Sequence, residues 1–178
     1  MLDQNSSTRP LILNGQPAAD QWVLVRDEDA PLPDDSPAIV SLARWQALEG
    51  SRALAPWLAS DTELTPELAE ELSGSPLIAI DFPKFTDGRG YSLARLLRER
   101  YGYTGEIRAV GDVLVDQVYF LSRCGFNALS LREDQWIEDA MRALKAFSRA
   151  YQPAVDVAEP LFRQRMREAS QRPAAALA

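Results

Sequence analysis

The feature that most constrains the fold is an alternation of short apolar runs with stretches of helical periodicity, which begins at Ala38. Apolar runs of about four to eight residues are typical of buried strands, whereas apolar residues three and four positions apart indicate helices. Strands that alternate with helices predict βαβ units joined by right-handed crossovers. The expected strands are Ala38–Ser41, Ala53–Leu58, Leu77–Asp81, Ile107–Val110 and Ala128–Leu131, and the expected helices are Leu42–Leu48, Pro66–Ser73, Ser92–Tyr101, Asp112–Cys124 and Asp134–Tyr151.

The N-terminal region adds a β-hairpin to this pattern. We expect Leu11–Leu13 to form a short strand, Asn14 and Gly15 a turn, and Trp22–Arg26 the second strand. The prediction is therefore an α/β fold with a mainly parallel sheet of about five strands, flanking helices and an N-terminal β-hairpin. A doubly wound sandwich and a partial βα barrel both satisfy this pattern.

The chain has 178 residues, of which 46% are apolar, enough to bury the core of one domain. We expect a disordered N-terminus over residues 1–10, a single α/β domain over residues 11–156 and a C-terminal extension over residues 157–178. The extension is expected to be partly frayed, over Pro173–Ala178, because the chain turns polar beyond Pro153.

The sequence carries no mark of a membrane or of export. No stretch approaches the roughly 18 uninterrupted apolar residues of a membrane span, and the N-terminus lacks the basic and apolar regions of a signal peptide. The single cysteine, Cys124, excludes an internal disulfide and fits a reducing compartment. We expect a cytoplasmic protein that does not contact a membrane.

The composition also removes several kinds of chemistry. The chain contains no histidine, which excludes a histidine base, a Ser-His-Asp triad and histidine metal ligands. One cysteine cannot hold an iron–sulfur cluster or a cysteine-rich zinc site within the chain. A formal net charge of −7 disfavours nucleic acid as a partner. Carboxylates, lysine, arginine and hydroxyls remain as the groups that the chain itself can supply for chemistry.

Charged residues follow three of the expected strands. In parallel sheets and barrels ligands bind at the carboxyl ends of the strands, so groups that follow neighbouring strands are expected to meet at one edge. These groups are Asp81, Lys84, Asp87, Arg89 and Ser92 after the Leu77 strand, Gly111 and Asp112 after the Ile107 strand, and Arg132, Glu133 and Asp134 after the Ala128 strand. The sequence therefore predicts a site at this edge.

The loop that follows the Leu77 strand is the main candidate for a ligand site. Lys84 and Arg89 precede a helix expected to begin at Ser92, whose free N–H groups and dipole favour an anion. Gly88 and Gly90 allow the backbone to approach a ligand closely. An oxyanion such as sulfate, sulfite or phosphate suits this arrangement, with Lys84, Asp87, Gly88, Arg89, Gly90 and Ser92 as the binding residues. The alternative is a glycine turn with an Asp87–Arg89 pair at the surface.

Asp81 and Asp112 are the candidate catalytic residues, as acid and base. With Asp87 they also have the composition of a magnesium site, although helix capping and ion pairing explain aspartates at such positions equally well. The string Gly88–Leu93 is similar to a dinucleotide fingerprint, but it lacks the third glycine and lies about seven residues after the strand instead of directly after it. We therefore expect neither a metal nor a resident cofactor.

Two segments of the chain resemble the hallmarks of a domain-of-unknown-function family of uncharacterised bacterial proteins. They are Asp81–Ser92 with Ala94–Arg98, and Arg108–Leu114 with Asp116, Gln117 and Arg123–Phe126. Members are usually encoded beside the assimilatory sulfite reductase hemoprotein, and they are often labelled "oxidoreductase probably involved in sulfite reduction". The resemblance extends over Leu77 to Asp156.

The resemblance implies a pathway, and the residues limit the role within it. Siroheme and iron–sulfur sites need cysteine ligands that one cysteine cannot supply, so an autonomous redox enzyme is disfavoured. The favoured hypothesis is an accessory protein of assimilatory sulfite reduction, which holds an oxyanion at the 81–92 loop and docks on the sulfite reductase hemoprotein or its electron donor. The alternative is a small-molecule enzyme in which Asp81 or Asp112 acts as acid or base while Lys84 and Arg89 grip an anionic substrate.

Overall fold

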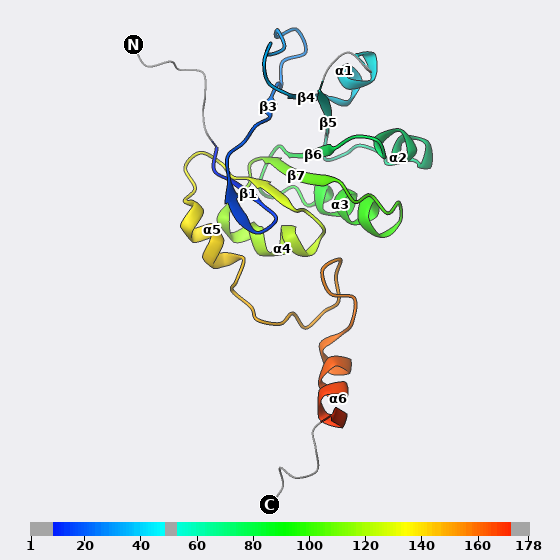
Figure 1. Ribbon diagram of the computed structural model, residues 1–178, viewed down its shortest axis with the longest axis vertical. Helices are drawn as coiled ribbons and strands as arrows, with labels where there is room; N and C mark the ends of the chain where they lie inside the picture. Colours follow the sequence, from blue (N-terminus) through cyan, green and yellow to red (C-terminus); the bar gives the residue numbers. More distant parts are fainter. Residues whose placement is uncertain (1–8, 49–52, 172–178) are drawn as a thin grey trace, which may run out of the picture.

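A computed structural model describes residues 9–48 and 53–171, and the strands in these ranges form one sheet (Figure 1). The strands are β1 (Leu11–Leu13), β2 (Gln16–Ala18), β3 (Val23–Leu24), β4 (Ala38–Ser41), β5 (Leu54–Leu58), β6 (Leu77–Phe82), β7 (Glu106–Gly111) and β8 (Ala128–Ser130). Their spatial order is β2-β1-β8-β7-β6-β5-β4-β3. Neighbours from β3 through β8 are parallel, whereas β1 is antiparallel to both β2 and β8.

The expected mainly parallel sheet of about five strands is wrong, because the sheet has eight strands, contains antiparallel pairs and curls into a half-barrel. The doubly wound alternative is wrong as well, since the parallel strands follow one another in chain order without a switch point. The sequence did not predict β2 as a strand, because a segment of three residues is too short to show an alternating pattern. β3 lies within the expected strand Trp22–Arg26, whose position in the sheet was wrong.

The N-terminal hairpin has a different second strand from the expected one. β1 pairs with Gln16–Ala18 directly after a turn in which Asn14 and Gly15 have positive φ angles of 50° and 74°. Val23 and Leu24, expected to complete the hairpin, lie instead at the far edge of the sheet beside β4. A two-residue turn forces the chain to pair with the segment that follows at once, so the more apolar segment farther on cannot take this place.

The helices are α1 (Leu42–Ala47), α2 (Pro66–Leu72), α3 (Arg89–Glu99), α4 (Val118–Arg123), α5 (Ile137–Ala143) and α6 (Leu161–Gln171), with a 3-10 turn η1 (Val115–Gln117) before α4. α1 and α2 lie where the sequence predicts them and begin at capping hydroxyls. Ser41 accepts a hydrogen bond from the N–H of Arg44, and Thr65 accepts one from the N–H of Leu68, each at 3.2 Å.

Three helix predictions need correction. α3 begins at Arg89 and not at Ser92, so its first turn contains the glycine loop. The helix expected from Asp112 begins only at Val115, as the 3-10 turn η1. The helix expected over Asp134–Tyr151 is α5, which begins at Ile137 and ends at Ala143, and Phe147 and Tyr151 of its apolar stripe are exposed.

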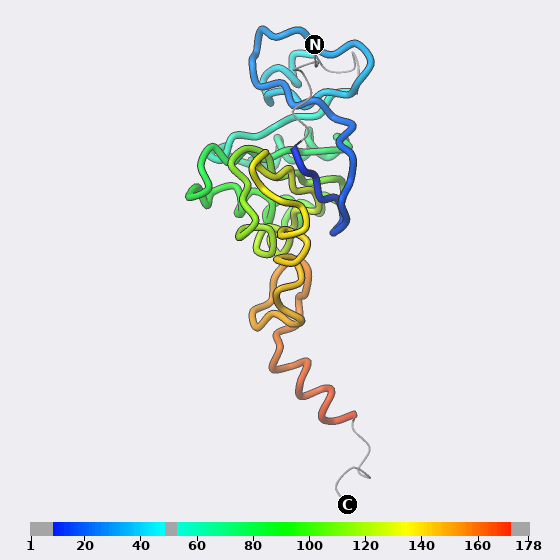
Figure 2. The backbone as a smooth tube through the Cα atoms, turned by 90° about the vertical axis from the view of Figure 1, so that its left-hand side faces the viewer, coloured from blue at the N-terminus to red at the C-terminus, as the bar shows by residue number. Residues whose placement is uncertain are grey.

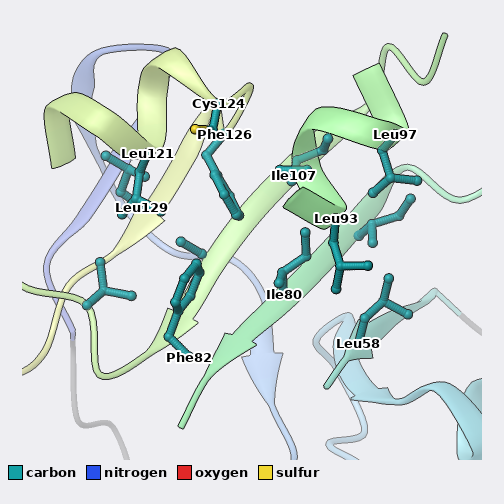
Figure 3. Packing of buried hydrophobic residues seen from close by; sticks show 14 of the residues in the cluster. Leu58, Ile80, Phe82, Leu93, Leu97, Ile107, Leu121, Cys124, Phe126 and Leu129 are labelled. Atoms are coloured by element: carbon teal, nitrogen blue, oxygen red, sulfur yellow. The ribbon is translucent and has the colours of Figure 1, made fainter. Parts of the chain in front are cut away.

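The helix-covered face of the sheet carries the main core (Figure 3). Ile80 and Phe82 of β6 point to this face and pack among Leu93 and Leu97 of α3. The rings of Phe82 and Phe126 lie 5.8 Å apart between centroids. Burying one side chain of this size stabilises a fold by roughly 1.5–3 kcal/mol, so this core stabilises the packing of α3 on β6.

The other face of the sheet is concave, and the chain itself bridges it. β2 and β3 lie at opposite edges, yet only residues 19–22 join them. The Cα steps from Ala18 to Val23 span at most about 18 Å, so the sheet curls until its two edges approach each other. The concave face carries a small apolar cluster of Ile39, Ala55, Leu77, Ala79 and Val110, packed against Trp22, Leu24 and Trp57.

α6 lies apart from the sheet, at the end of a long connection from α5 (Figures 1 and 2). Ion pairs of 2.8 Å from Arg149 to Glu168 and from Arg167 to Glu159 hold it to the preceding segment. Within residues 9–48 and 53–171, no helix has the length and apolar character needed to cross a membrane.

Two expectations about the chain ends fall mostly outside the described residues. They are the disorder of residues 1–10, of which only Arg9 and Pro10 are described, and the fraying of Pro173–Ala178. Arg9 donates hydrogen bonds to the backbone carbonyls of Gly111 and Leu131, so this part of the N-terminal segment is tied to the sheet.

Candidate functional site

Alternation along the strands places one set of side chains in the concave side of the sheet. Near β3 these are Trp22, Leu24 and Arg26, and on β7 they are Arg108 and Val110. Together with the edge formed by β1 and β2, they line a cleft of about 840 Å³. Clefts of about 300–1,000 Å³ are typical of small-molecule sites.

The cleft opens at the carboxyl ends of β6 and β7, where a second hollow of about 310 Å³ adjoins it. Arg9 and Arg26 line both spaces. Asp81, Asp112 and Arg132 line the second hollow, so side chains that follow neighbouring strands do meet at one edge. These five residues are called the cleft mouth below.

Both aspartates of the cleft mouth are paired with arginines. Asp81, whose side chain is 12% exposed, accepts a hydrogen bond from Nη2 of Arg26 at 2.7 Å. Asp112 accepts from Nη1 of Arg132 at 2.7 Å and from the N–H of Phe85 at 2.9 Å. The Phe85 N–H, and after it Arg132, lower the pKa of Asp112 below its ordinary value. This carboxylate is therefore a weak base near neutral pH.

Arg9 is the exception at the cleft mouth, because its guanidinium forms no ion pair with any described carboxylate. Its Nε donates to the carbonyl of Leu131 at 2.9 Å, and its Nη2 donates to the carbonyl of Gly111. Burial, and next the neighbouring charge of Arg26, lower the pKa of Arg9, while carboxylates such as Glu133 act on it only from longer range. A half-buried cation that faces a second cation is stabilised by a bound anion.

Arg108 lies deeper in the cleft, in the middle of β7. Its side chain is 3% exposed and is flanked by two carboxylates: that of Asp20 accepts from Nη1 at 2.7 Å, and that of Glu106 accepts from Nε at 2.6 Å. Its third nitrogen, Nη2, donates to no described residue. Because Arg108 lies in the wall of the cleft, Nη2 is a donor that the cleft offers to a ligand.

The loop expected to bind an anion already holds a carboxylate of the chain itself. Asp87 accepts hydrogen bonds from Nη2 of Arg89 at 2.7 Å, from the Arg89 N–H at 3.1 Å and from the hydroxyl of Ser60 at 2.7 Å. Arg89, and after it Ser60, hold the pKa of Asp87 well below its ordinary value. Asp61 lies 3.6 Å from Nη1 of Arg89. The Asp87–Arg89 pair named above as the alternative is present, and anion binding at this loop stays a prediction.

The other residues of this loop lie in different surroundings. Lys84, Gly88 and Ser92 are exposed. Gly90 is buried, and a Cβ added to it would lie 2.8 Å from the ring of Phe82. Gly90 therefore serves the close packing of α3 on β6, whereas a Cβ on Gly88 would meet nothing within 4 Å.

Among the described residues, no group of three or more histidine, cysteine, aspartate or glutamate side chains could hold a metal ion. Asp81 and Asp112 share the cleft mouth, but Asp87 lies with Ser60 instead, so the three aspartates do not assemble. Cys124 is buried in the core, and this burial raises the pKa of its thiol, as expected of a structural cysteine.

The N-terminal wall of the cleft was not predicted from the sequence. Two signals for it were present. Arg108 interrupts the apolar run of β7, and a charge inside a buried strand requires a partner. Trp22, Leu24 and Arg26 alternate with other residues, as side chains on one face of a strand do. Neither pattern shows which residues these side chains face, and nothing in the sequence around Arg9 indicates that it lines a cleft.

Comparison with known proteins relates the chain to a family. No match was found among curated proteins or among solved structures. A sequence model of one family matches residues 55–162, from β5 to the start of α6. The matched range contains Asp81, Arg108 and Asp112 of the cleft but neither Arg9 nor Arg26. Since it covers more than half of the chain, the chain belongs to the family described as "Bacterial protein of unknown function (DUF934)".

Proposed function

We propose that the chain is an accessory protein of assimilatory sulfite reduction that binds a small oxyanion at the cleft mouth. Arg9 carries the anion part of the proposal, as a half-buried guanidinium beside Arg26 without a carboxylate of its own. The pathway rests on the resemblance of Asp81–Ser92 and Arg108–Leu114 to proteins encoded beside the sulfite reductase hemoprotein. A cytoplasmic location belongs to the same proposal, because a single free cysteine fits a reducing compartment.

The charge at the cleft mouth supports an anionic ligand. Of the three guanidinium groups there, Arg26 pairs with Asp81 and Arg132 pairs with Asp112 and Asp134, so Arg9 is the one that has no carboxylate partner among the described residues. The guanidinium fork matches the geometry of sulfur and phosphorus oxyanions, with two parallel N–H donors. The adjoining hollow of about 310 Å³ is large enough for such an ion with water around it.

The anion proposal predicts a difference between two arginine variants. In Arg9→Gln the oxyanion loses a charged donor, so we expect the affinity for sulfite and sulfate to fall by a factor of about ten or more. Arg165→Gln removes the same charge from the exposed surface of α6 and should leave the affinity unchanged. Isothermal titration calorimetry at constant ionic strength measures both effects.

Equal affinities in the unmodified chain and in Arg9→Gln would refute the cleft mouth as the anion site. If Arg89→Gln alone weakened binding, the site would be the 81–92 loop, as the sequence predicts. Thermal unfolding without anion checks that every variant is folded before its affinity is compared.

The proposed partner is the sulfite reductase hemoprotein or its electron donor, and α6 is the element that we expect to dock. α6 extends away from the sheet (Figure 2), and Phe162 and Met166 on its surface are 54% and 69% exposed.

We expect a tagged chain to co-purify with the sulfite reductase hemoprotein or its electron donor. The double variant Phe162→Ser, Met166→Ser should weaken this complex about tenfold or more. Arg165→Gln on the same helix is the matched control. Absence of a complex with either partner, together with unchanged sulfite turnover in cells lacking the chain, would contradict the accessory role.

A second candidate is a small-molecule enzyme, which the meeting of Asp81 and Asp112 at the cleft mouth favours. It ranks below the first because both carboxylates are held by arginines and the lowered pKa of Asp112 makes it a poor proton acceptor. An Asp112→Asn chain that still binds the oxyanion but has lost its role in the cell would reverse this order.

A further inference from the structure

We infer that the cleft binds an elongated organic anion with an acidic group at the cleft mouth, an apolar body along the concave face and a hydroxyl group bound by Arg108 at the far end. The inference rests on the proposed anion site for the acidic group. It adds the chemistry of the remaining ligand, which no inorganic oxyanion supplies.

The middle of the cleft has apolar walls. Leu24 and Ile39 line it on one side and Val110 on the other, with Trp22 at the bridging segment. A volume of about 840 Å³ is far more than one oxyanion fills. Apolar clefts of this size gain affinity by removing apolar ligand surface from water, so the part of the ligand that lies here is a hydrocarbon chain or an aromatic ring system.

The position of Arg108 sets the length of the ligand. Gly111, whose carbonyl accepts a hydrogen bond from Arg9, marks the mouth end of β7. At about 3.3 Å per residue, Arg108 lies about 10 Å farther along the strand. Two fused aromatic rings with a substituent at each end span a distance of this order.

The charges around Arg108 determine the group at the far end. Asp20 and Glu106 together outweigh the single guanidinium by one negative charge, so a second acidic group is disfavoured there. Nη2 of Arg108 can donate to an acceptor in the cleft, and the nearby Asp20 carboxylate can accept a hydrogen bond. A neutral hydroxyl satisfies both, because it accepts and donates at the same oxygen.

Three naphthalene probes separate these features without any change to the protein. 6-Hydroxynaphthalene-2-sulfonate carries both end groups, naphthalene-2-sulfonate lacks the hydroxyl, and 2-naphthol lacks the sulfonate. We expect the first probe to bind at one site per chain. Loss of the sulfonate should weaken binding about tenfold or more, and loss of the hydroxyl about three- to tenfold. Fluorescence titration of each probe measures the affinities.

Three variants assign each feature to its residue. Arg9→Gln should remove most of the advantage of the sulfonate. Arg108→Lys keeps a positive charge beside Asp20 but lacks Nη2, so the advantage of the hydroxyl should disappear. Ala18→Trp, on the edge strand that lines the cleft, should block the naphthalene probes and leave sulfate binding intact. Arg165→Gln on α6 should change none of these affinities.

The outcomes separate this inference from the proposed function. Equal affinities for the three probes, or full binding in Ala18→Trp, would overturn the inference. Sulfate binding that depends on Arg9, without any binding of the naphthalenesulfonates, would overturn the inference and leave the oxyanion site standing. Absence of both kinds of binding would overturn both.

Discussion

Replacing Gly111 with alanine should lower the free energy of unfolding by about 3 kcal/mol or more. Gly111 has a φ of +97°, and a Cβ added to it would lie 2.3 Å from the carbonyl oxygen of Phe82 and 2.6 Å from Oδ1 of Asp81. The Phe82 carbonyl accepts a hydrogen bond from the Asp112 N–H at 2.7 Å, so it cannot move without separating the ends of β6 and β7. The same change would disturb the cleft mouth, because Arg9 is bound to the Gly111 carbonyl.

Gly88→Ala is the matched control for this prediction. A Cβ on Gly88 would meet nothing within 4 Å, and its φ of −87° suits any residue, so the stability should stay within about 0.5 kcal/mol or rise slightly. Urea denaturation gives both differences in free energy, and the melting temperature of Gly111→Ala should fall by about 6–12 °C. A Gly111→Ala chain as stable as the Gly88→Ala chain would show that the strand ends adapt, contrary to the geometry.

The parallel part of the fold could be predicted because each long strand is a run of buried and mostly apolar residues. Leu77–Ile80 and Ile107–Val110 are buried on both faces, so their composition alone separates them from the surrounding loops. The placement of β2 and β3 could not be predicted in the same way. Their side chains are mostly exposed or half-buried, and their positions follow from closure of a curled sheet between distant parts of the chain.

The candidate site also has a part that the sequence predicts and a part that it does not. Asp81 and Asp112 could be placed together because residues that follow neighbouring parallel strands meet at one edge. Arg26 reaches Asp81 across 55 positions of the chain, and Arg9 reaches Gly111 across 102 positions. These contacts depend on how far the sheet curls, which neither periodicity nor composition reports. The 81–92 loop drew attention for its glycines, of which Gly90 serves packing against Phe82.

Arg108→Met should be the second strongly destabilising change, lowering the free energy of unfolding by about 3 kcal/mol or more. The wild-type guanidinium, 3% exposed, lies between Asp20 and Glu106, whose side chains are 29% and 17% exposed. Methionine fills a similar volume but leaves the two carboxylates facing each other without a cation. Most of the loss then comes from unpaired charge and not from lost packing.

A triple variant distinguishes these two causes. Asp20→Asn and Glu106→Gln remove the unpaired charges from the Arg108→Met chain, and we expect them to restore most of the lost stability in urea denaturation. Replacing a buried charged cluster with neutral groups is often close to neutral, whereas removing one partner is costly. If the triple variant were as unstable as Arg108→Met alone, the packing of the arginine stem would be the larger contribution, and the ionic cluster would be ruled out as the main source of stability in this wall of the cleft.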